Sequence, residues 1–212
     1  MTDEPEGKRE RRGYHHGNLR EALIDAALDL INRKGPGGFT FAEAARAAGV
    51  SPAAPYRHFK DREDLIADVA RQGFEAFEKA LARAWDGGRP TPRVAFARVG
   101  HAYLDFARRE PAYFSAMFEA GVTPGAHADL RVAGDRAFGV LREACEALVA
   151  TVPAARRPPA LMVALHVWAL AHGIASLFAR GDAARRPIPM SPEDLLEAAT
   201  LVYLDGLGVG AG

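Results

Sequence analysis

The side chains best suited to binding a partner lie in one short stretch, residues 49–65, with the sequence GVSPAAPYRHFKDREDL. Tyr56, Arg57 and His58 follow one another there without a gap, shortly after two prolines. A helix this short is not stable alone and forms only when it packs against neighbouring elements. Its polar side chains donate hydrogen bonds and can carry positive charge. We therefore expect them to face something other than the protein's own core.

Two short helices joined at Gly49 would position these side chains. Thr40 and Glu43 have the spacing of a capping box, which predicts a helix that begins at Thr40. Gly49 can adopt the left-handed conformation that ends a helix. Ser51 is suited to cap a second helix, with Pro52 at its first position. This pattern predicts a helix-turn-helix, whose second helix lies in the major groove of DNA.

The charge of the whole chain neither supports nor excludes a nucleic-acid partner. The 212 residues contain 27 Lys plus Arg and 27 Asp plus Glu, so the formal net charge is zero. Residues 8–20 nevertheless hold five basic side chains against the single acidic Glu10. Such an arm can neutralise phosphates or enter a minor groove. A solubilising tail is the alternative interpretation of the same charges.

The hydrophobic pattern predicts an all-α protein. Alternation of apolar and polar residues is missing, whereas apolar residues recur at i, i+3 and i+4 along most of the chain. We predict about nine helices, and their expected ranges are 18–34, 40–49, 51–59, 61–85, 92–109, 111–120, 127–151, 157–180 and 191–207.

One segment, residues 160–179, has no formally charged side chain and is long enough to span a bilayer. It contains two histidines, and arginines flank it on both sides, so we expect instead a helix in a core or a subunit interface. The N-terminus lacks the apolar region of a signal peptide. The single cysteine, Cys145, cannot form an internal disulfide. Both features suit a cytoplasmic protein.

Residues 18–66 resemble the DNA-binding domain of the TetR/AcrR family of bacterial repressors. The resemblance rests on AGVS at the turn, YRHF at the end of the recognition helix, and a charged run into a long fourth helix. PAYFSAMFEAG (111–121) and VWALAHGIASL (167–177) are similar to a ligand-binding subtype named for its Trp-His-Gly pattern, here Trp168, His172 and Gly173. The resemblance implies a three-helix DNA-binding domain (18–66) and a larger ligand-binding and dimerisation domain (67–212), and we expect the basic arm before them (1–17) to be disordered.

The resemblance also assigns DNA contacts. Thr40 and Arg62 would contact phosphates at helix N-termini, and Tyr56 and His58 would contact phosphate or sugar. The groove-facing positions would be Pro52, Ala53, Ala54 and Arg57, and Ser51 is a further candidate DNA-binding residue. Residues 52–55, PAAP, offer no side-chain donors, so base reading from them is limited to apolar contact, for example with thymine methyl groups. Because Pro55 clashes with a regular first turn, we expect a late helix start or a tight 3₁₀ turn.

The second domain is expected to bind a small molecule and to dimerise through the last two helices. The candidate ligand-binding residues are His101, Phe106, Tyr113, Met117, Phe118, Trp168 and His172. Taken singly, most of these aromatic residues could equally be ordinary core. His166 and His172 point about 120° apart on a helix, so they cannot share a metal ion. We expect no metal and no cofactor.

Together these features predict a DNA-binding regulator, namely a homodimeric repressor that a small-molecule effector releases from a palindromic operator. A constitutive DNA-binding dimer without a ligand response is the alternative. An enzyme is disfavoured because no phosphate loop, Gly-x-Ser-x-Gly, HExxH or Cys/His ligand set occurs. The sequence identifies neither the ligand nor the operator nor the regulated genes.

Overall fold

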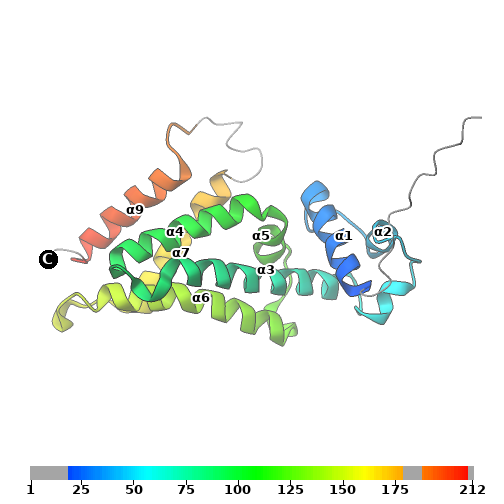
Figure 1. The fold of residues 1–212 in the computed structure, drawn as a ribbon, viewed down its shortest axis with the longest axis horizontal. Helices are drawn as coiled ribbons and strands as arrows, with labels where there is room; N and C mark the ends of the chain where they lie inside the picture. Colours follow the sequence, from blue (N-terminus) through cyan, green and yellow to red (C-terminus); the bar gives the residue numbers. More distant parts are fainter. Residues whose placement is uncertain (1–18, 179–187, 210–212) are drawn as a thin grey trace, which may run out of the picture.

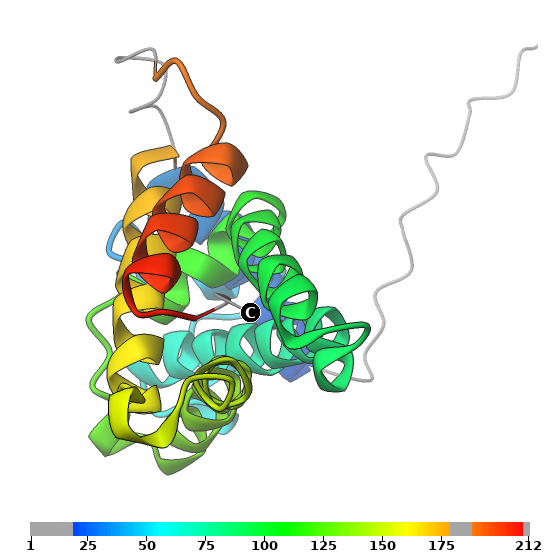
Figure 2. The ribbon, with the colours of Figure 1, turned by 90° about the vertical axis from the view of Figure 1, so that its left-hand side faces the viewer.

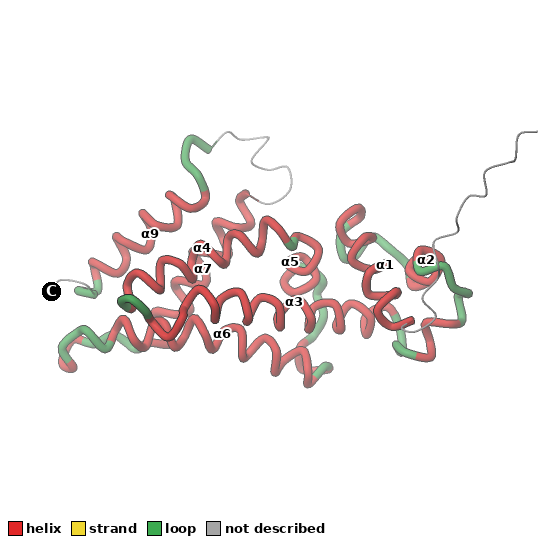
Figure 3. Tube along the Cα trace, in the orientation of Figure 1, coloured by secondary structure: helices red, strands yellow, loops and turns green. Residues whose placement is uncertain are grey.

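The computed structural model describes residues 19–178 and 188–209, and within these ranges the chain is all-helical (Figure 3). The described α-helices are α1 (Leu19–Lys34), α2 (Phe41–Ala47), α3 (Arg62–Trp85), α4 (Pro92–Arg109), α5 (Pro111–Phe118), α6 (Ala128–Val149), α7 (Ala160–Phe178) and α9 (Pro192–Gly206). Each of the nine expected helices has a counterpart. The third is the 3₁₀ helix η1 (Ala54–Arg57) and not an α-helix.

Some expectations fall on residues outside these ranges. They are the basic arm of residues 1–17, the first residue of the helix expected at 18–34, and the last residues of the segment expected at 157–180.

The N-terminal helices α1 and α2, η1 and the beginning of α3 pack around one apolar core at one end of the molecule (Figure 1). Leu23 and Ile31 of α1 and Leu65 of α3 are completely buried in this core, and Phe59 closes it beneath η1. Asp61 caps α3, since its side chain accepts a hydrogen bond from the backbone N–H of Asp64.

Helix α3 continues from this core into a second one. Its 24 residues extend over about 36 Å at 1.5 Å per residue. Around its C-terminal half, α4, α6, α7 and α9 form a bundle, with α4 on one side and α7 on the opposite side (Figure 2). Phe77, Leu81 and Trp85 of α3 are buried in the bundle core.

The two cores are not separated by a linker. The expected division after residue 66 falls inside α3, and the N-terminal core also includes Ala112 and Ala116 of α5 and Leu130 of α6. Helices α5 and α6 therefore belong to the larger domain and contact the smaller one directly.

Within the described ranges, α7 is the one helix whose length and composition would also suit a membrane span, with a mean hydropathy of 1.8. A third of that window, 33%, is buried inside the chain. The other residues of α7 are half-buried or exposed, as expected for a helix that packs against a further partner.

Candidate nucleic-acid interface and adjoining cavity

The beginning of α2 is fixed by the capping box that the sequence predicts. The backbone N–H of Glu43 donates to Thr40 Oγ1 at 3.2 Å, and the backbone N–H of Thr40 donates to Glu43 Oε2 at 2.7 Å. Lys34 Nζ lies 2.7 Å from Glu43 Oε1. This lysine contact, together with the hydrogen bonds from Thr40, lowers the pKa of Glu43 to about 2. The exposed Thr40 is thereby held at a helix N-terminus, where anions are favoured.

Gly49 makes the turn between α2 and η1, as predicted. Its φ of 73° is the left-handed conformation, which costs glycine little. The backbone N–H of Gly49 donates to Arg46 O at 3.0 Å, and that of Val50 donates to Ala45 O at 3.0 Å. These two bonds close α2 and direct the chain into the next element.

The recognition element is shorter than the expected 51–59 helix. It is a four-residue 3₁₀ helix, as anticipated from the second proline. The expectation that Ser51 caps this helix is wrong, because the cap position is Ala53 and no side-chain cap bond is present. The backbone carbonyl of Ser51 instead accepts a hydrogen bond from Ala54 N at 3.0 Å. Pro55 is buried beneath the turn and is the second residue of η1, where a proline needs no N–H donor, so the helix begins at Ala54 and not at Pro52.

The outer surface of this turn carries the side chains that the sequence singles out. Ser51, Pro52 and Ala53 are exposed at its leading edge, whereas Ala54 is half-buried. Arg57 and His58 are also exposed. Tyr56 is 64% exposed, although its ring packs edge-on against Phe41 with centroids 5.1 Å apart. The packing fixes the direction of the Tyr56 ring and leaves its hydroxyl outside.

Arg62, the first residue of α3, is placed differently from the other candidates. Its guanidinium lies 4.8 Å from the centroid of Phe39 and donates to the carbonyl of Pro36. Its Nε is buried without a hydrogen-bond partner. In this conformation Arg62 joins α3 to the loop between α1 and α2, and a phosphate contact would require part of the side chain to turn outward.

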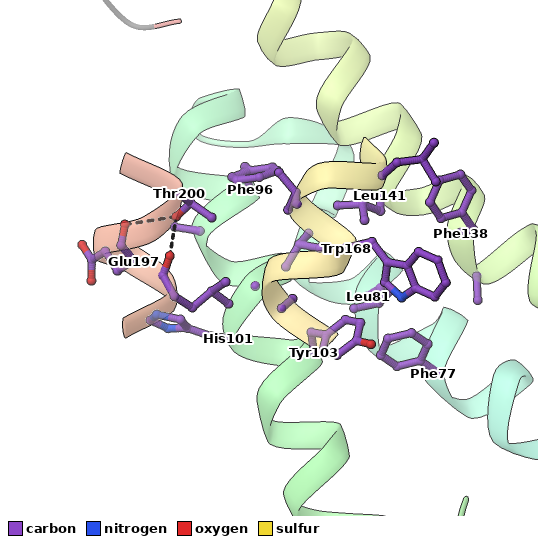
Figure 4. A pocket seen from close by; sticks show the side chains of 18 of the residues that line it. Phe77, Leu81, Phe96, His101, Tyr103, Phe138, Leu141, Trp168, Glu197 and Thr200 are labelled. Atoms are coloured by element: carbon purple, nitrogen blue, oxygen red, sulfur yellow. Dashed lines mark hydrogen bonds between the residues drawn. The ribbon is translucent and has the colours of Figure 1, made fainter. Parts of the chain in front are cut away.

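A cavity of about 480 Å³ lies in the helical bundle and is lined by α3, α4, α5, α6, α7 and α9. Its wall is mostly apolar, with aromatic residues on one side and a few polar residues on another (Figure 4). The aromatic residues that line it are Phe74, Phe77, Phe96, Tyr103, Phe118, Phe138 and Trp168. The polar side includes His101, Glu197 and Thr200, and the Thr200 hydroxyl donates to Leu196 O at 2.7 Å.

Four of the seven candidate ligand residues line this cavity, namely His101, Met117, Phe118 and Trp168. The other three, Phe106, Tyr113 and His172, are not among the residues that line it. Phe106 is buried and packs against Phe77 with centroids 5.0 Å apart.

His172 lies behind the cavity wall and contacts a residue that lines it. Its Nδ1 shares a hydrogen bond of 3.0 Å with the hydroxyl of Tyr103, which does line the cavity. The imidazole stacks on Phe114 with centroids 5.5 Å apart. Burial lowers the pKa of His172 and raises that of Tyr103, so both groups are uncharged near neutral pH. The pair holds the Tyr103 ring in place.

Other residues in the cavity wall carry no motif and were not predicted. Phe74 and Phe77 lie on α3, and Phe138 lies on α6, each within an ordinary amphipathic repeat. The helical period places such residues toward an interior but does not distinguish a cavity wall from a packed core. Glu197 and Thr200 reach the cavity because α9 packs across α4 and α7.

Among the described residues, no group of three or more His, Cys, Asp or Glu side chains could hold a metal ion.

Two family models match the chain. The model described as "Bacterial regulatory proteins, tetR family" matches residues 23–69, and that described as "Tetracyclin repressor-like, C-terminal domain" matches residues 96–203. The second match includes most of the residues that line the cavity, and the first covers α2, η1 and the beginning of α3.

Individual proteins agree with these matches. The HTH-type transcriptional regulator BetI of Rhizobium meliloti (strain 1021) is 35% identical over 101 residues, which cover 47% of this chain and 50% of BetI. The HTH-type transcriptional regulator AcrR of Shigella flexneri is 40% identical over 50 residues, 24% of this chain and 23% of AcrR. The chain thus spans about half the length, or less, of these curated relatives.

The solved structures match over a greater length. A protein of unknown function from Rhodococcus sp. RHA1 has a TM-score of 0.73 and 31% identity, over 92% of this chain and 98% of the other. The TetR family transcriptional regulator PfmR from Thermus thermophilus has a TM-score of 0.66, over 87% and 96% of the two chains. Because the two sequences are only 21% identical, this structural match shows a shared fold and nothing further.

Proposed function

The chain belongs to the TetR family of bacterial regulatory proteins, and from this premise we propose that it represses transcription by binding a palindromic operator as a homodimer. Members of this family are DNA-binding transcription regulators that act as dimers. The observation that carries the proposal is the recognition turn of residues 51–58, which is exposed on its outer side and anchored by the buried Pro55 and Phe59.

The DNA contacts are proposed for residues whose side chains lie on this outer surface. Tyr56 and His58 contact phosphate or sugar, and Thr40 contacts a phosphate at the beginning of α2. Arg57 reads base edges together with the groove-facing residues Ser51, Pro52, Ala53 and Ala54. Arg62 contributes a phosphate contact when it turns outward from Pro36.

We propose that the cavity in the bundle holds a small, mainly apolar effector that releases the operator. Its volume of about 480 Å³ is within the range of sites for small molecules, and its wall is apolar with a few polar groups. His101, Met117, Phe118 and Trp168 would contact the effector. Phe106, Tyr113 and His172 would support that wall from behind. A constitutive DNA-binding dimer would leave the cavity without a role.

The dimer interface is proposed on α7 and α9. Both helices expose large apolar side chains, and on α9 these include Val202 at 74% and Leu201 at 46%. Two such helices and their symmetry-related copies can form a four-helix interface.

Trp168 and His172, one turn apart on α7, also support our assignment of the C-terminal domain to the Trp-His-Gly subtype. We place the protein in the cytoplasm, where its operator DNA is found.

The test of DNA binding compares two exposed residues of the recognition turn. Tyr56→Ala should weaken binding to all duplexes alike, because a phosphate or sugar contact does not depend on sequence. Arg57→Ala should instead reduce the preference for the operator over random duplex by about tenfold. Fluorescence anisotropy on both duplexes over a range of salt concentrations measures these effects. An affinity that does not fall with salt would contradict the proposal.

The effector is tested separately. A compound that binds the cavity should raise the melting temperature and weaken operator binding in the same concentration range. A thermal-shift screen followed by operator release measures both. If stabilising compounds leave operator affinity unchanged, the constitutive dimer is the better description.

A further inference from the structure

The cavity is not fully enclosed by one chain. Several side chains that line it keep a large solvent-accessible area, and on α7 these are Leu165 at 44% and Trp168 at 37%. Part of this area faces the cavity, and Leu165 also lies on the same face of α7 as Leu161, which is exposed outside the cavity. The cavity therefore reaches the surface beside α7.

The exposed side of α7 continues from these two residues. Leu161, Leu165 and Trp168 have i, i+4 and i+7 spacing, so they form one stripe along the helix. Leu161 is 53% exposed and does not line the cavity. One apolar stripe thus forms part of the cavity wall at one end and part of the outer surface at the other.

Small residues lie next to this stripe. Ala169, Gly173 and Ser176 are exposed on α7, and no atom would lie within 4 Å of a Cβ added to Gly173. A second helix can approach closely over residues of this size, since interaxial distance depends on the side chains at the contact. Exposed apolar surface of this kind on a soluble protein indicates an interaction site.

The occupant is a second copy of this chain. The family acts as dimers, and a two-fold interface places the same surface patch of both subunits in contact. α7 and α9 are the proposed interface helices, and α9 adds exposed residues that also line the cavity, Glu197 and Leu201. A partner that covers α7 must cover Leu165 and Trp168, because they lie on the same stripe as Leu161.

We propose that the effector cavity is completed by the second subunit, so that an uncharged, mainly apolar ligand binds the dimer more tightly than the monomer. The inference rests on the proposed function, which assigns the effector to this cavity and the dimer to α7 and α9. It adds a linkage between the two. A ligand that prefers the dimer must also strengthen it by the same factor.

The first test uses the wild-type protein and Nile red, an uncharged apolar fluorophore. Sedimentation over a dilution series gives the dimer dissociation constant with and without saturating dye. We expect the dye to lower this constant about tenfold or more. A dye that bound only the exposed apolar face of a monomer would shift the equilibrium in the opposite direction. A dissociation constant that rises or stays unchanged overturns the inference.

The second test uses matched valine variants. Val202→Asp places a charge on the exposed face of α9 outside the cavity wall, whereas Val94→Asp makes the same change at an exposed position of α4 that is also outside the cavity wall. Val202→Asp should weaken the dimer and, at dilutions where it is monomeric, bind Nile red about tenfold less tightly. Val94→Asp should behave as wild type. If Val202→Asp remains dimeric, Gly173→Asp on α7 replaces it.

The outcomes separate the inference from the proposed function. Monomeric Val202→Asp that binds Nile red as tightly as the wild-type dimer overturns the inference and leaves the effector site intact. If the wild-type dimer binds neither Nile red nor any compound of a thermal-shift screen, both the proposed effector site and the inference are wrong. Recovery of dye binding by Val202→Asp at protein concentrations that restore the dimer supports the inference.

Discussion

At the scale of single residues, the recognition turn has few groups that can read bases by hydrogen bonds. Pro52 and Ala53 occupy its exposed leading edge, and Pro55 is buried beneath it. Apolar side chains in a major groove contact the thymine methyl group, which is the apolar feature of a base pair there. We therefore infer that part of the operator preference comes from thymine methyl groups.

This inference predicts a response to a change in the DNA. Replacing thymine by deoxyuridine at the half-site positions facing Pro52 and Ala53 removes the methyl group and keeps the base pair. Operator affinity should fall about fivefold, corresponding to about 1 kcal/mol. Titration of methylated and unmethylated duplexes measures this loss. Ala53→Gly should make the protein less sensitive to the same replacement, because only the Pro52 contact remains, whereas a wild-type protein equally tight on both duplexes would exclude methyl contact.

The residue scale also shows what the sequence could and could not predict. Thr40 and Glu43 were predictable because a capping box is a local pattern. The inward placement of Arg62 was not, because it depends on Phe39 and on the carbonyl of Pro36, which the fold brings to the same place. Similarly, nothing local distinguishes Phe106, which packs in the core, from Phe118, which lines the cavity.

At the scale of elements, helix boundaries followed from caps and breakers, whereas the recognition element did not keep its expected length. The α3 start at Asp61 and the α9 start at Ser191 both have a side chain that accepts a backbone hydrogen bond, as the sequence indicates. Residues 51–59 do not form the expected α-helix, because the buried Pro55 limits the element to a 3₁₀ turn. The burial of Pro55 is a tertiary contact, so the sequence predicted the 3₁₀ turn but not its length.

The capping box of α2 predicts a particular dependence on pH. Glu43 has a pKa of about 2 in the folded protein against 4.5 as its ordinary value, so its contribution to stability is complete above about pH 4.5. That contribution is lost as the pH falls from 4.5 toward 2. Glu43→Gln should therefore be less stable than wild type at pH 7, and the difference should shrink on acidification.

Urea denaturation at pH 7, 4 and 3 measures this difference. The control is Glu146→Gln, since Glu146 pairs with Arg142 at 3.5 Å on an exposed face of α6 and caps no helix. Its stability relative to wild type should stay nearly constant over the same pH range. If the difference in unfolding free energy between Glu43→Gln and wild type were unchanged at pH 3, the charge of the Glu43 carboxylate would not contribute to stability.

At the scale of the whole molecule, α6 connects the cavity to the DNA-binding core. Gly134 and Phe138 line the cavity, and Leu130, one turn earlier on the same face, is 4% exposed within the N-terminal core. A displacement of α6 by a bound effector would therefore move Leu130 and the helices packed on it. Coupling of this kind requires a physical element that both sites influence, and α6 contacts both.

Leu130→Ala should weaken this coupling without weakening effector binding. The substitution removes buried contacts between α6 and the N-terminal core but leaves the cavity wall unchanged. We expect an effector found by thermal shift to bind with wild-type affinity, while the factor by which it weakens operator binding falls about fivefold. Leu148→Ala is the matched control, because Leu148 is 2% exposed on α6 in the other core and outside the cavity wall. If both variants reduce the factor equally, general destabilisation explains the loss, and α6 is not the connecting element.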